Sequence, residues 1–199
     1  MLKRFVLLIA LCLPAPLAMV SFAWAATLGD DGLHKEDWFS ITFRDIREDM
    51  DAAAEEGKRL AIIIEQRGCI YCKKVHEEIL TDPQVRDYIK TNYKMVQYNL
   101  YGDEEVTDLD GEVLTEKTAA RKWGIAFTPT ILFLPESADG ELDTRQAAVA
   151  AMPGAFQKGT FLDMFTWVRE KLYDTEEDFQ RYHARRIRER TEAGIPNTD

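Results

Sequence analysis

The chain has 199 residues, of which 46% are hydrophobic and 30% charged, and its formal net charge at pH 7 is −10. This length and apolar content suffice for one buried core, so they predict a single domain and exclude a disordered chain. The negative charge would repel a polyanion, which excludes nucleic acid as a partner.

The N-terminal segment has the pattern of a secretory signal peptide. Lys3 and Arg4 give it a positive start, and an apolar run follows from residue 5 to residue 13. Ala23-Trp24-Ala25 then supplies a small-x-small cleavage site. The uncharged stretch is long enough for a retained membrane anchor, but two prolines in its middle favour the signal peptide. We therefore expect residues 1–25 to be cleaved off near Ala25, residues 26–199 to form the domain, and the mature protein to reside in the periplasm.

The next segments predict a leader, a helix and a buried strand. Residues 27–35 are polar and glycine-rich, which indicates a loose leader. Thr42 with Asp45 resembles a capping box, and apolar residues follow at helical spacing until Gly57. Leu60–Ile64 is an unbroken apolar run, typical of a strand covered on both faces.

A cysteine pair follows this strand, and helical spacing continues after the pair. Asp82 and Pro83 fit the cap and the first position of another helix. Residues 96–100 alternate between apolar and polar, which predicts the next strand. An acidic insertion follows over residues 102–110, with a hairpin turn expected at Asp110-Gly111. This insertion is either a solvated loop or a charged surface that selects a partner.

The second half continues the alternation of helices and strands. We expect a short helix over residues 115–123, a buried strand over 131–134, an antiparallel partner strand over 145–151 and an amphipathic helix over 161–172. The charged tail from Asp174 onward predicts an extra C-terminal helix that contacts the body through Phe179 and Tyr182. Its basic cluster over residues 181–190 either suits the helix dipole or docks on a membrane surface. The element order predicts an α/β fold with a mixed central sheet and flanking helices.

The cysteines carry the clearest chemical signal. Cys12 lies in the signal segment, so the mature chain keeps only Cys69 and Cys72. A Cys-x-x-Cys at the start of a helix places both sulfurs on one face, close enough for a disulfide. The helix N-terminus favours the thiolate. We expect Cys69, at the exposed entry to the helix, to be the attacking thiolate and Cys72 to resolve the mixed disulfide.

Other interpretations of the pair are a structural disulfide and a metal site. A disulfide of this spacing closes so small a loop that it would restrain the unfolded chain little. Structural zinc usually takes four protein ligands, and the three histidines are scattered along the chain. We expect no metal and no cofactor besides the redox-active disulfide, with a copper-binding module as the alternative.

Thr128-Pro129 forms a second constellation, directly before the buried strand at residues 131–134. An X–Pro bond at such a position is often cis for a functional reason, although a proline can also simply open a strand. The backbone there could pair with an extended substrate segment. Thr128, Pro129 and the intervening pair Ile70 and Tyr71 are therefore the candidate substrate-binding residues.

These motifs together resemble the thioredoxin superfamily over nearly the whole mature chain. The resemblance rests on the strand Leu60–Ile64, on Gly68-Cys69-Ile70-Tyr71-Cys72-Lys73 and on Thr128-Pro129-Thr130. Three further segments are similar to the periplasmic thioredoxin of bacterial sulfur-oxidation clusters (SoxW-like): residues 65–69, 111–117 and 120–124. The resemblance implies a thioredoxin fold, Cys69 as nucleophile, Cys72 as resolving cysteine and Pro129 in cis. It also implies that an inner-membrane thiol transporter delivers electrons, which pass to exported proteins.

The chain departs from cytosolic thioredoxins at two positions. Their Trp-Cys-Gly-Pro-Cys loop is replaced here, and the buried acid six residues before the first cysteine is Ile63. An aliphatic side chain cannot accept the proton of Cys72. Glu65 and His76, which lie on either side of the pair, are the candidate substitutes for this proton relay, although a Glu or His at such a position is more often an ordinary solvated or packed surface residue.

The sequence thus predicts a periplasmic thiol-disulfide oxidoreductase. Its expected substrates are exported proteins with disulfides or modified thiols, and its expected direction is reduction. A disulfide oxidase or isomerase would use the same residues, since the dipeptide between the cysteines only partly sets the reduction potential. A non-catalytic thioredoxin-fold module that binds a partner or copper is the alternative from another class.

Overall fold

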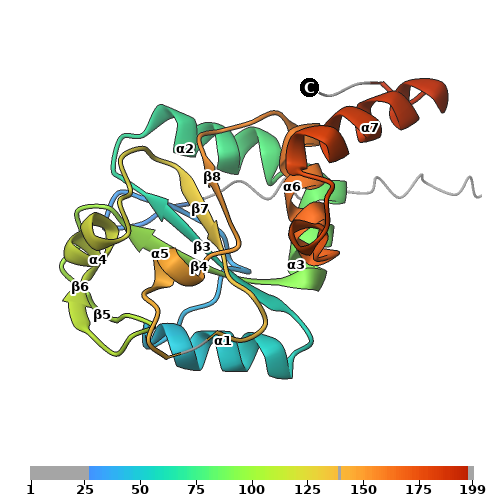
Figure 1. The fold of residues 1–199 in the computed structure, drawn as a ribbon. Coiled ribbons are helices and arrows are strands. Elements are labelled where there is room, and N and C mark those ends of the chain that lie inside the picture. The colour runs from blue at the N-terminus through green and yellow to red at the C-terminus, as the bar shows by residue number, and fades with distance from the viewer. Residues whose placement is uncertain (1–26, 139, 197–199) are drawn as a thin grey trace, which may run out of the picture.

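The computed structural model describes residues 27–138 and 140–196. The predicted signal segment, its cleavage site and Cys12 lie outside the described residues. The central feature of the described part is a four-stranded sheet in the order β4-β3-β7-β8. These strands span Tyr93–Asn99, Arg59–Glu65, Thr130–Phe133 and Ala150–Pro153. β3 pairs in parallel with β4 and antiparallel with β7, and β7 pairs antiparallel with β8 (Figure 1).

Helices cover both faces of the sheet, so every residue of β3 is buried. Alternate residues of a strand face opposite sides. Ala61 and Ile63 accordingly join a core cluster with residues of α3 (Pro83–Asn92) and α6 (Lys158–Arg169). Ile62 and Ile64 join a second cluster with residues of α1 (Ile46–Glu55) and α4 (Glu116–Lys122). This mixed sheet with helices on both faces confirms the predicted fold class.

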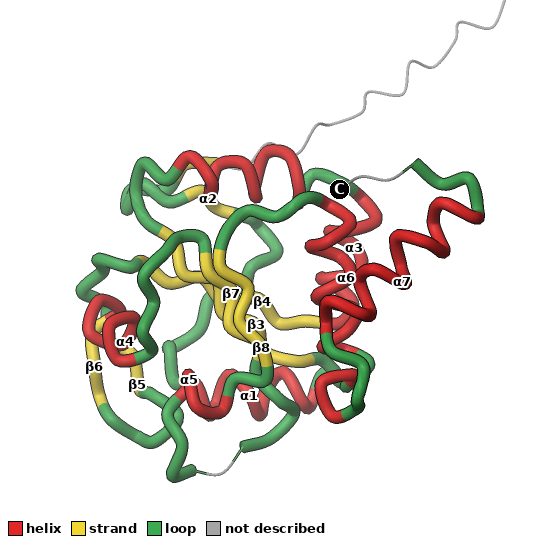
Figure 2. Tube along the Cα trace, turned by 45° about the horizontal axis from the view of Figure 1, so that its top comes forward, coloured by secondary structure: helices red, strands yellow, loops and turns green. Residues whose placement is uncertain are grey.

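The remaining elements are short or peripheral (Figures 1 and 2). The cysteine helix α2 spans Ile70–Lys74 and continues into a π-helical segment, Val75–Ile79, where the sequence predicts regular helix. α5 spans Thr144–Ala147, a 3₁₀ turn spans Leu172–Asp174, and the C-terminal α7 spans Phe179–Glu192. Two small hairpins complete the fold: β1 (Thr27–Leu28) with β2 (His34–Lys35), and β5 (Glu105–Thr107) with β6 (Val113–Thr115).

The acidic insertion forms an antiparallel hairpin, which confirms the turn predicted at Asp110-Gly111. Gly111 has φ +86°, a left-handed conformation that favours glycine. Lys122 of α4 reaches back to three carboxylates of this hairpin, Asp108 at 2.7 Å, Asp110 at 2.6 Å and Glu112 at 2.9 Å. These ion pairs add to an apolar contact, since Val106 and Leu109 of the hairpin are buried in the same core cluster as Ala119 and Ala120 of α4.

Three further local predictions were wrong. The leader at residues 27–35 is a two-stranded hairpin rather than a loose segment. Asp45 alone caps α1, by accepting from the amides of Arg47 and Glu48, while the hydroxyl of Thr42 donates to Asp49. The partner strand expected at residues 145–151 begins at Ala150, because a capping box between Asp143 and Gln146 nucleates a helical turn first.

The C-terminal helix α7 packs through Tyr182, which is buried as predicted. Its arginines are engaged in ion pairs: Arg190 lies 2.8 Å from the buried Asp163 of α6, and Arg185 pairs with Glu177 and Glu189 at 2.9 and 2.8 Å. The Arg190–Asp163 pair fixes the helix on α6, whereas the Arg185 pairs lie within α7 and the loop before it; all of them use part of the helix's positive charge internally. Among the described residues, no helix is both long enough and apolar enough to cross a bilayer.

Candidate active site

The cysteine pair lies where β3 leaves the sheet and α2 begins. β3 ends at Glu65, and Gly68 has φ +72°, which lets the chain turn sharply into the helix. Cys69 is the N-cap of α2 in extended conformation. Its Sγ accepts a hydrogen bond from the backbone N–H of Cys72 at 3.0 Å. A polar N–H aimed at the sulfur stabilises negative charge on it, so this geometry favours the thiolate form of Cys69 after reduction.

Cys69 and Cys72 form a disulfide with their Cα atoms 5.2 Å apart, which is the oxidised state of the pair. Cys69 is 9% exposed and Cys72 is 2% exposed. An incoming sulfur can therefore reach Cys69 more readily than Cys72. Cys69 is thus less exposed in the oxidised protein than the sequence predicts for the entry of the helix, but it is still the more accessible of the two cysteines.

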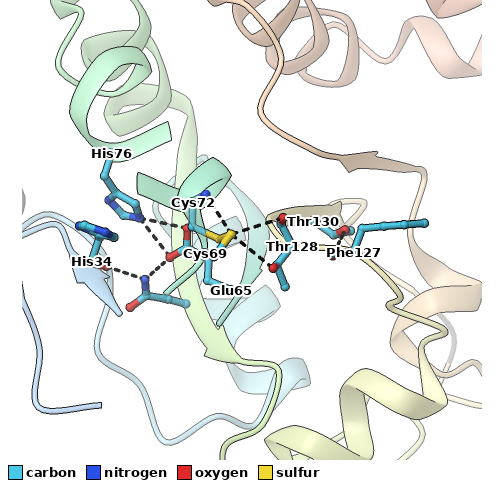
Figure 3. Close-up of a disulfide and its surroundings, with 9 residues drawn as sticks. His34, Glu65, Cys69, Cys72, His76, Phe127, Thr128 and Thr130 are labelled. Carbon is cyan, nitrogen blue, oxygen red and sulfur yellow. Dashed lines mark hydrogen bonds and ion pairs between the residues drawn. A yellow bond between two sulfur atoms is a disulfide. The ribbon is translucent and has the colours of Figure 1, made fainter. Parts of the chain in front are cut away.

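The Thr128-Pro129 loop lies directly against the disulfide (Figure 3). The peptide bond between these two residues is cis, as predicted. The carbonyl oxygen of Thr128 lies 3.4 Å from Cys69 Sγ, and the Thr128 hydroxyl donates to the same sulfur at 3.4 Å. The Thr130 hydroxyl donates to the Phe127 carbonyl at 2.7 Å and fixes the loop on its far side. The structure thus brings the two predicted constellations together at one sulfur atom.

Ile70 and Tyr71, the other candidate substrate-binding residues, project from the first turn of α2. They are 72% and 59% exposed. Large apolar side chains at this exposure beside a reactive sulfur are available to contact a second molecule.

Glu65 and His76 are joined in a buried cluster beside the cysteine helix. His76 Nε2 lies 3.0 Å from a carboxylate oxygen of Glu65, and His76 Nδ1 lies 2.9 Å from Glu36. The His76 and Glu65 side chains are 0% and 1% exposed. Burial opposes a charged imidazole, but hydrogen bonds to the two carboxylates outweigh it and raise the pKa of His76 to about 9. At neutral pH His76 is therefore a buried cation between the carboxylates of Glu36 and Glu65.

A short polar network ties this cluster to the N-terminal hairpin. The side-chain amide of Gln97, on β4, donates to Glu65 and to the backbone carbonyl of His34, the latter at 2.7 Å. The ring of His34 stacks on that of His76 with centroids 5.6 Å apart (Figure 3). Segments far apart in the sequence thus supply the walls around Glu65.

Glu36 and Gln97 are not recognisable from the sequence, because no local pattern marks contacts across 40 positions (Glu36 to His76) or 32 positions (Gln97 to Glu65). For Glu65, in contrast, a signal exists in the sequence. A strand has a side-chain period of two, so Glu65 lies on the same face of β3 as Ile63. Compared with the buried acid of thioredoxins, whose position is occupied here by Ile63, Glu65 lies two residues further along the strand. It stays on the same side of the sheet, which α2 covers. The structure thus places a carboxylate close to where the thioredoxin resemblance expects one.

No three His, Cys, Asp or Glu side chains within residues 27–138 and 140–196 are arranged to hold a metal ion.

The sequence model of the thioredoxin-like domain family matches residues 46–166, which include the cysteine pair and the Thr128-Pro129 loop. The chain belongs to this family. A thioredoxin-fold protein from Helicobacter pylori has a similar structure, with a TM-score of 0.55 at 21% sequence identity over 79% of this chain and 94% of that one. A thioredoxin from Thermus thermophilus matches with a TM-score of 0.48 at 19% identity, over 64% of this chain and 88% of that one. No curated protein sequence matches this chain.

The family and the geometry agree on the type of site. This member of the thioredoxin-like domain family carries a Cys-x-x-Cys pair at disulfide distance, at the entry of a helix that follows a buried strand. That is the arrangement of a thiol-disulfide oxidoreductase-type fold.

Proposed function

We propose that this protein is a periplasmic thiol-disulfide oxidoreductase that reduces disulfides or thiol adducts on exported proteins through Cys69 and Cys72. The observation that carries the proposal is the position of Cys69 Sγ. It is bonded to Cys72, accepts the N–H of Cys72 at 3.0 Å and lies 3.4 Å from the carbonyl oxygen of Thr128. A nucleophile, a resolving thiol and a backbone surface for the substrate therefore meet at one point.

The reaction begins from the reduced protein. The Cys69 thiolate attacks one sulfur of the substrate disulfide, a Cys69–substrate disulfide forms and the other substrate sulfur leaves as a thiolate. Cys72 then loses its proton and attacks Cys69 Sγ, which restores the Cys69–Cys72 disulfide and releases the second substrate thiolate. Two electrons pass from the cysteine pair to the substrate, and the departing thiolates take up protons. A dithiol donor must reduce the pair again before the next turnover.

The signal-like N-terminus supports export, and the SoxW-like segments support a relation to the periplasmic thioredoxins of sulfur oxidation, with an inner-membrane thiol transporter as electron donor. The direction is tested by equilibrating the mature protein with glutathione buffers and counting alkylated thiols by mass. We expect a reduction potential of about −250 mV or lower, as in strongly reducing members of this fold. A potential of about −130 mV would instead make the protein an oxidase. A pair that never titrates would leave only a structural disulfide.

We include Glu65 and His76 in the proposal as the proton relay for Cys72. Glu65 is a buried carboxylate whose hydrogen-bond partner, His76, is itself held protonated. We expect Glu65→Gln to slow the resolution of the mixed disulfide by roughly 10²-fold, the lower range for general acid–base catalysis. The measurement is single-turnover release of the second substrate thiol across pH, together with the pH profile of Cys69 alkylation.

Glu77→Gln is the matched control for this prediction. Glu77 is exposed, lies on the same helical segment as His76 and pairs with Lys73 at 3.7 Å. It should leave both profiles as in the wild type. If Glu65→Gln and His76→Ala also leave both profiles unchanged, neither residue takes part in proton transfer.

A further inference from the structure

A groove of about 400 Å³ opens beside Cys69. Three segments line it: the cysteine loop, residues 100–101 after β4, and residues 126–128 before β7. Four of its lining side chains are large, apolar or aromatic, and open to solvent. Besides Ile70 and Tyr71, Tyr101 is 64% exposed and Phe127 is 70% exposed. Clusters of exposed large apolar side chains mark interaction surfaces on soluble proteins, and aromatic residues are enriched at their centres.

Tyr101 also borders a second hollow of about 750 Å³, so the two hollows are neighbours at this residue. Carboxylates predominate in the second hollow, which is lined by Asp31, Asp103, Glu104 and Glu116 together with Arg44 and Arg67. The acidic insertion therefore begins next to the groove, since Gly102 directly follows Tyr101 in the chain.

The positive groups of the second hollow are engaged by the protein itself. The Arg44 guanidinium lies 3.5 Å from the buried Glu116 and 3.7 Å from Glu104. Arg67 donates to the backbone carbonyls of Asp30 and Asp31 at 3.3 and 3.4 Å. Asp103 is exposed, and the side chain of Glu104 is 71% exposed. Four carboxylates and two guanidinium groups line this hollow, so its net charge is negative and its field favours a cation in the occupant.

We propose that this groove selects disulfides on polypeptide segments that carry an apolar side chain next to the cysteine and a basic side chain beyond it. The inference rests on the proposed function, since it names the substrate class of the same site. The apolar side chain would contact Tyr71, Tyr101 and Phe127, and the basic group would face Asp103 and Glu104. Small anionic disulfides such as oxidised glutathione lack the apolar side chain and are repelled by the same carboxylates.

The test uses the mature protein, reduced and freed of reductant, in single turnovers with synthetic peptides whose one cysteine is joined by a disulfide to neutral 2-mercaptoethanol. The peptides differ at two positions: Phe or Gly beside the cysteine, and Lys or Glu beyond it. We expect the Phe/Lys peptide to react about 10-fold faster than the Phe/Glu peptide at low ionic strength, with the ratio falling in 0.5 M salt because exposed charges are then screened.

Two variants assign the selectivity to its residues. The double variant Asp103→Asn, Glu104→Gln should bring the Lys-to-Glu ratio to within about twofold, and Tyr101→Ala should reduce the Phe-to-Gly ratio while leaving charge selectivity in place. Asp51→Asn with Glu55→Gln removes the same number of charges from α1, at the other end of the fold (Figure 1), and should retain both ratios.

The outcomes separate this inference from the proposed function. Equal rates for all peptides, or a Lys preference that survives in the double variant, would overturn the inference while leaving a working oxidoreductase. Failure to reduce any peptide would overturn the proposed function and the substrate class with it.

Discussion

Replacing Cys69 with serine should lower the rate of disulfide cleavage by roughly 10³-fold or more, because a serine hydroxyl stays protonated at neutral pH and is a far weaker nucleophile than a thiolate. The remaining thiol cannot take over, since Cys72 is 2% exposed and lies one turn inside the helix. The rate is measured as single-turnover release of thiol from a peptide disulfide.

Cys72→Ser should behave differently. Cys69 would still attack, but no thiol would resolve the mixed disulfide, so a covalent complex with the substrate should accumulate. Mass spectrometry detects this complex, and dithiothreitol dissociates it. If the covalent complex accumulates with Cys69→Ser and not with Cys72→Ser, the roles of the two cysteines are reversed. If both variants keep wild-type activity, the protein acts as a binding module without redox turnover.

The cysteine site is predictable from sequence because its determinants are local. A buried strand, a turn at Gly68 and a helix that begins at Cys69 are consecutive in the chain, so their order alone places the two sulfurs together. The Thr128-Pro129 loop lies farther along the chain, yet it opens β7, which pairs directly with β3. Strand pairing therefore carries this loop to the cysteines once the fold class is known.

The charged surroundings of the site could not be predicted in the same way. Glu36 reaches His76 across 40 positions, and Gln97 reaches Glu65 across 32. Such contacts depend on how the N-terminal hairpin packs against β4, and the polar composition of residues 27–35 suggests a solvated leader instead. The groove at Tyr101 depends likewise on where the acidic insertion folds back. Sequence therefore identifies the reactive atoms, whereas tertiary packing decides what surrounds them.

His76 should make the stability of the oxidised protein depend on pH in the mildly alkaline range. Its pKa is about 9 in the folded protein and about 6.5 in an unfolded chain. A group whose pKa is raised on folding stabilises the protein fully below the unfolded value, and this stabilisation is lost as the pH rises through the folded value. The free energy of unfolding should therefore fall by about 2 kcal/mol between pH 7 and pH 9.5.

Urea unfolding of the disulfide-bonded protein at several pH values in this range measures the effect. Starting at pH 7 avoids the titration of Asp49, whose pKa burial raises to about 6, and stopping at pH 9.5 limits the ionisation of tyrosines. His76→Gln should abolish the slope and also lower stability at pH 7 by roughly 3–5 kcal/mol, because it leaves a buried carboxylate without its charged partner.

Two further variants keep this prediction testable if His76→Gln does not fold. Glu36→Gln removes one of the two carboxylates that hold the proton on His76, at a position less deeply buried than Glu65, so it should reduce the slope without abolishing it. His34→Gln removes an imidazole outside this pair of carboxylates and should keep the wild-type slope. A flat profile in the wild type would mean that His76 is neutral in the folded protein. A neutral imidazole donates through one ring nitrogen only, so either Glu36 or Glu65 would lose its hydrogen-bond donor, and the relay proposed for Cys72 would lose its buried cation.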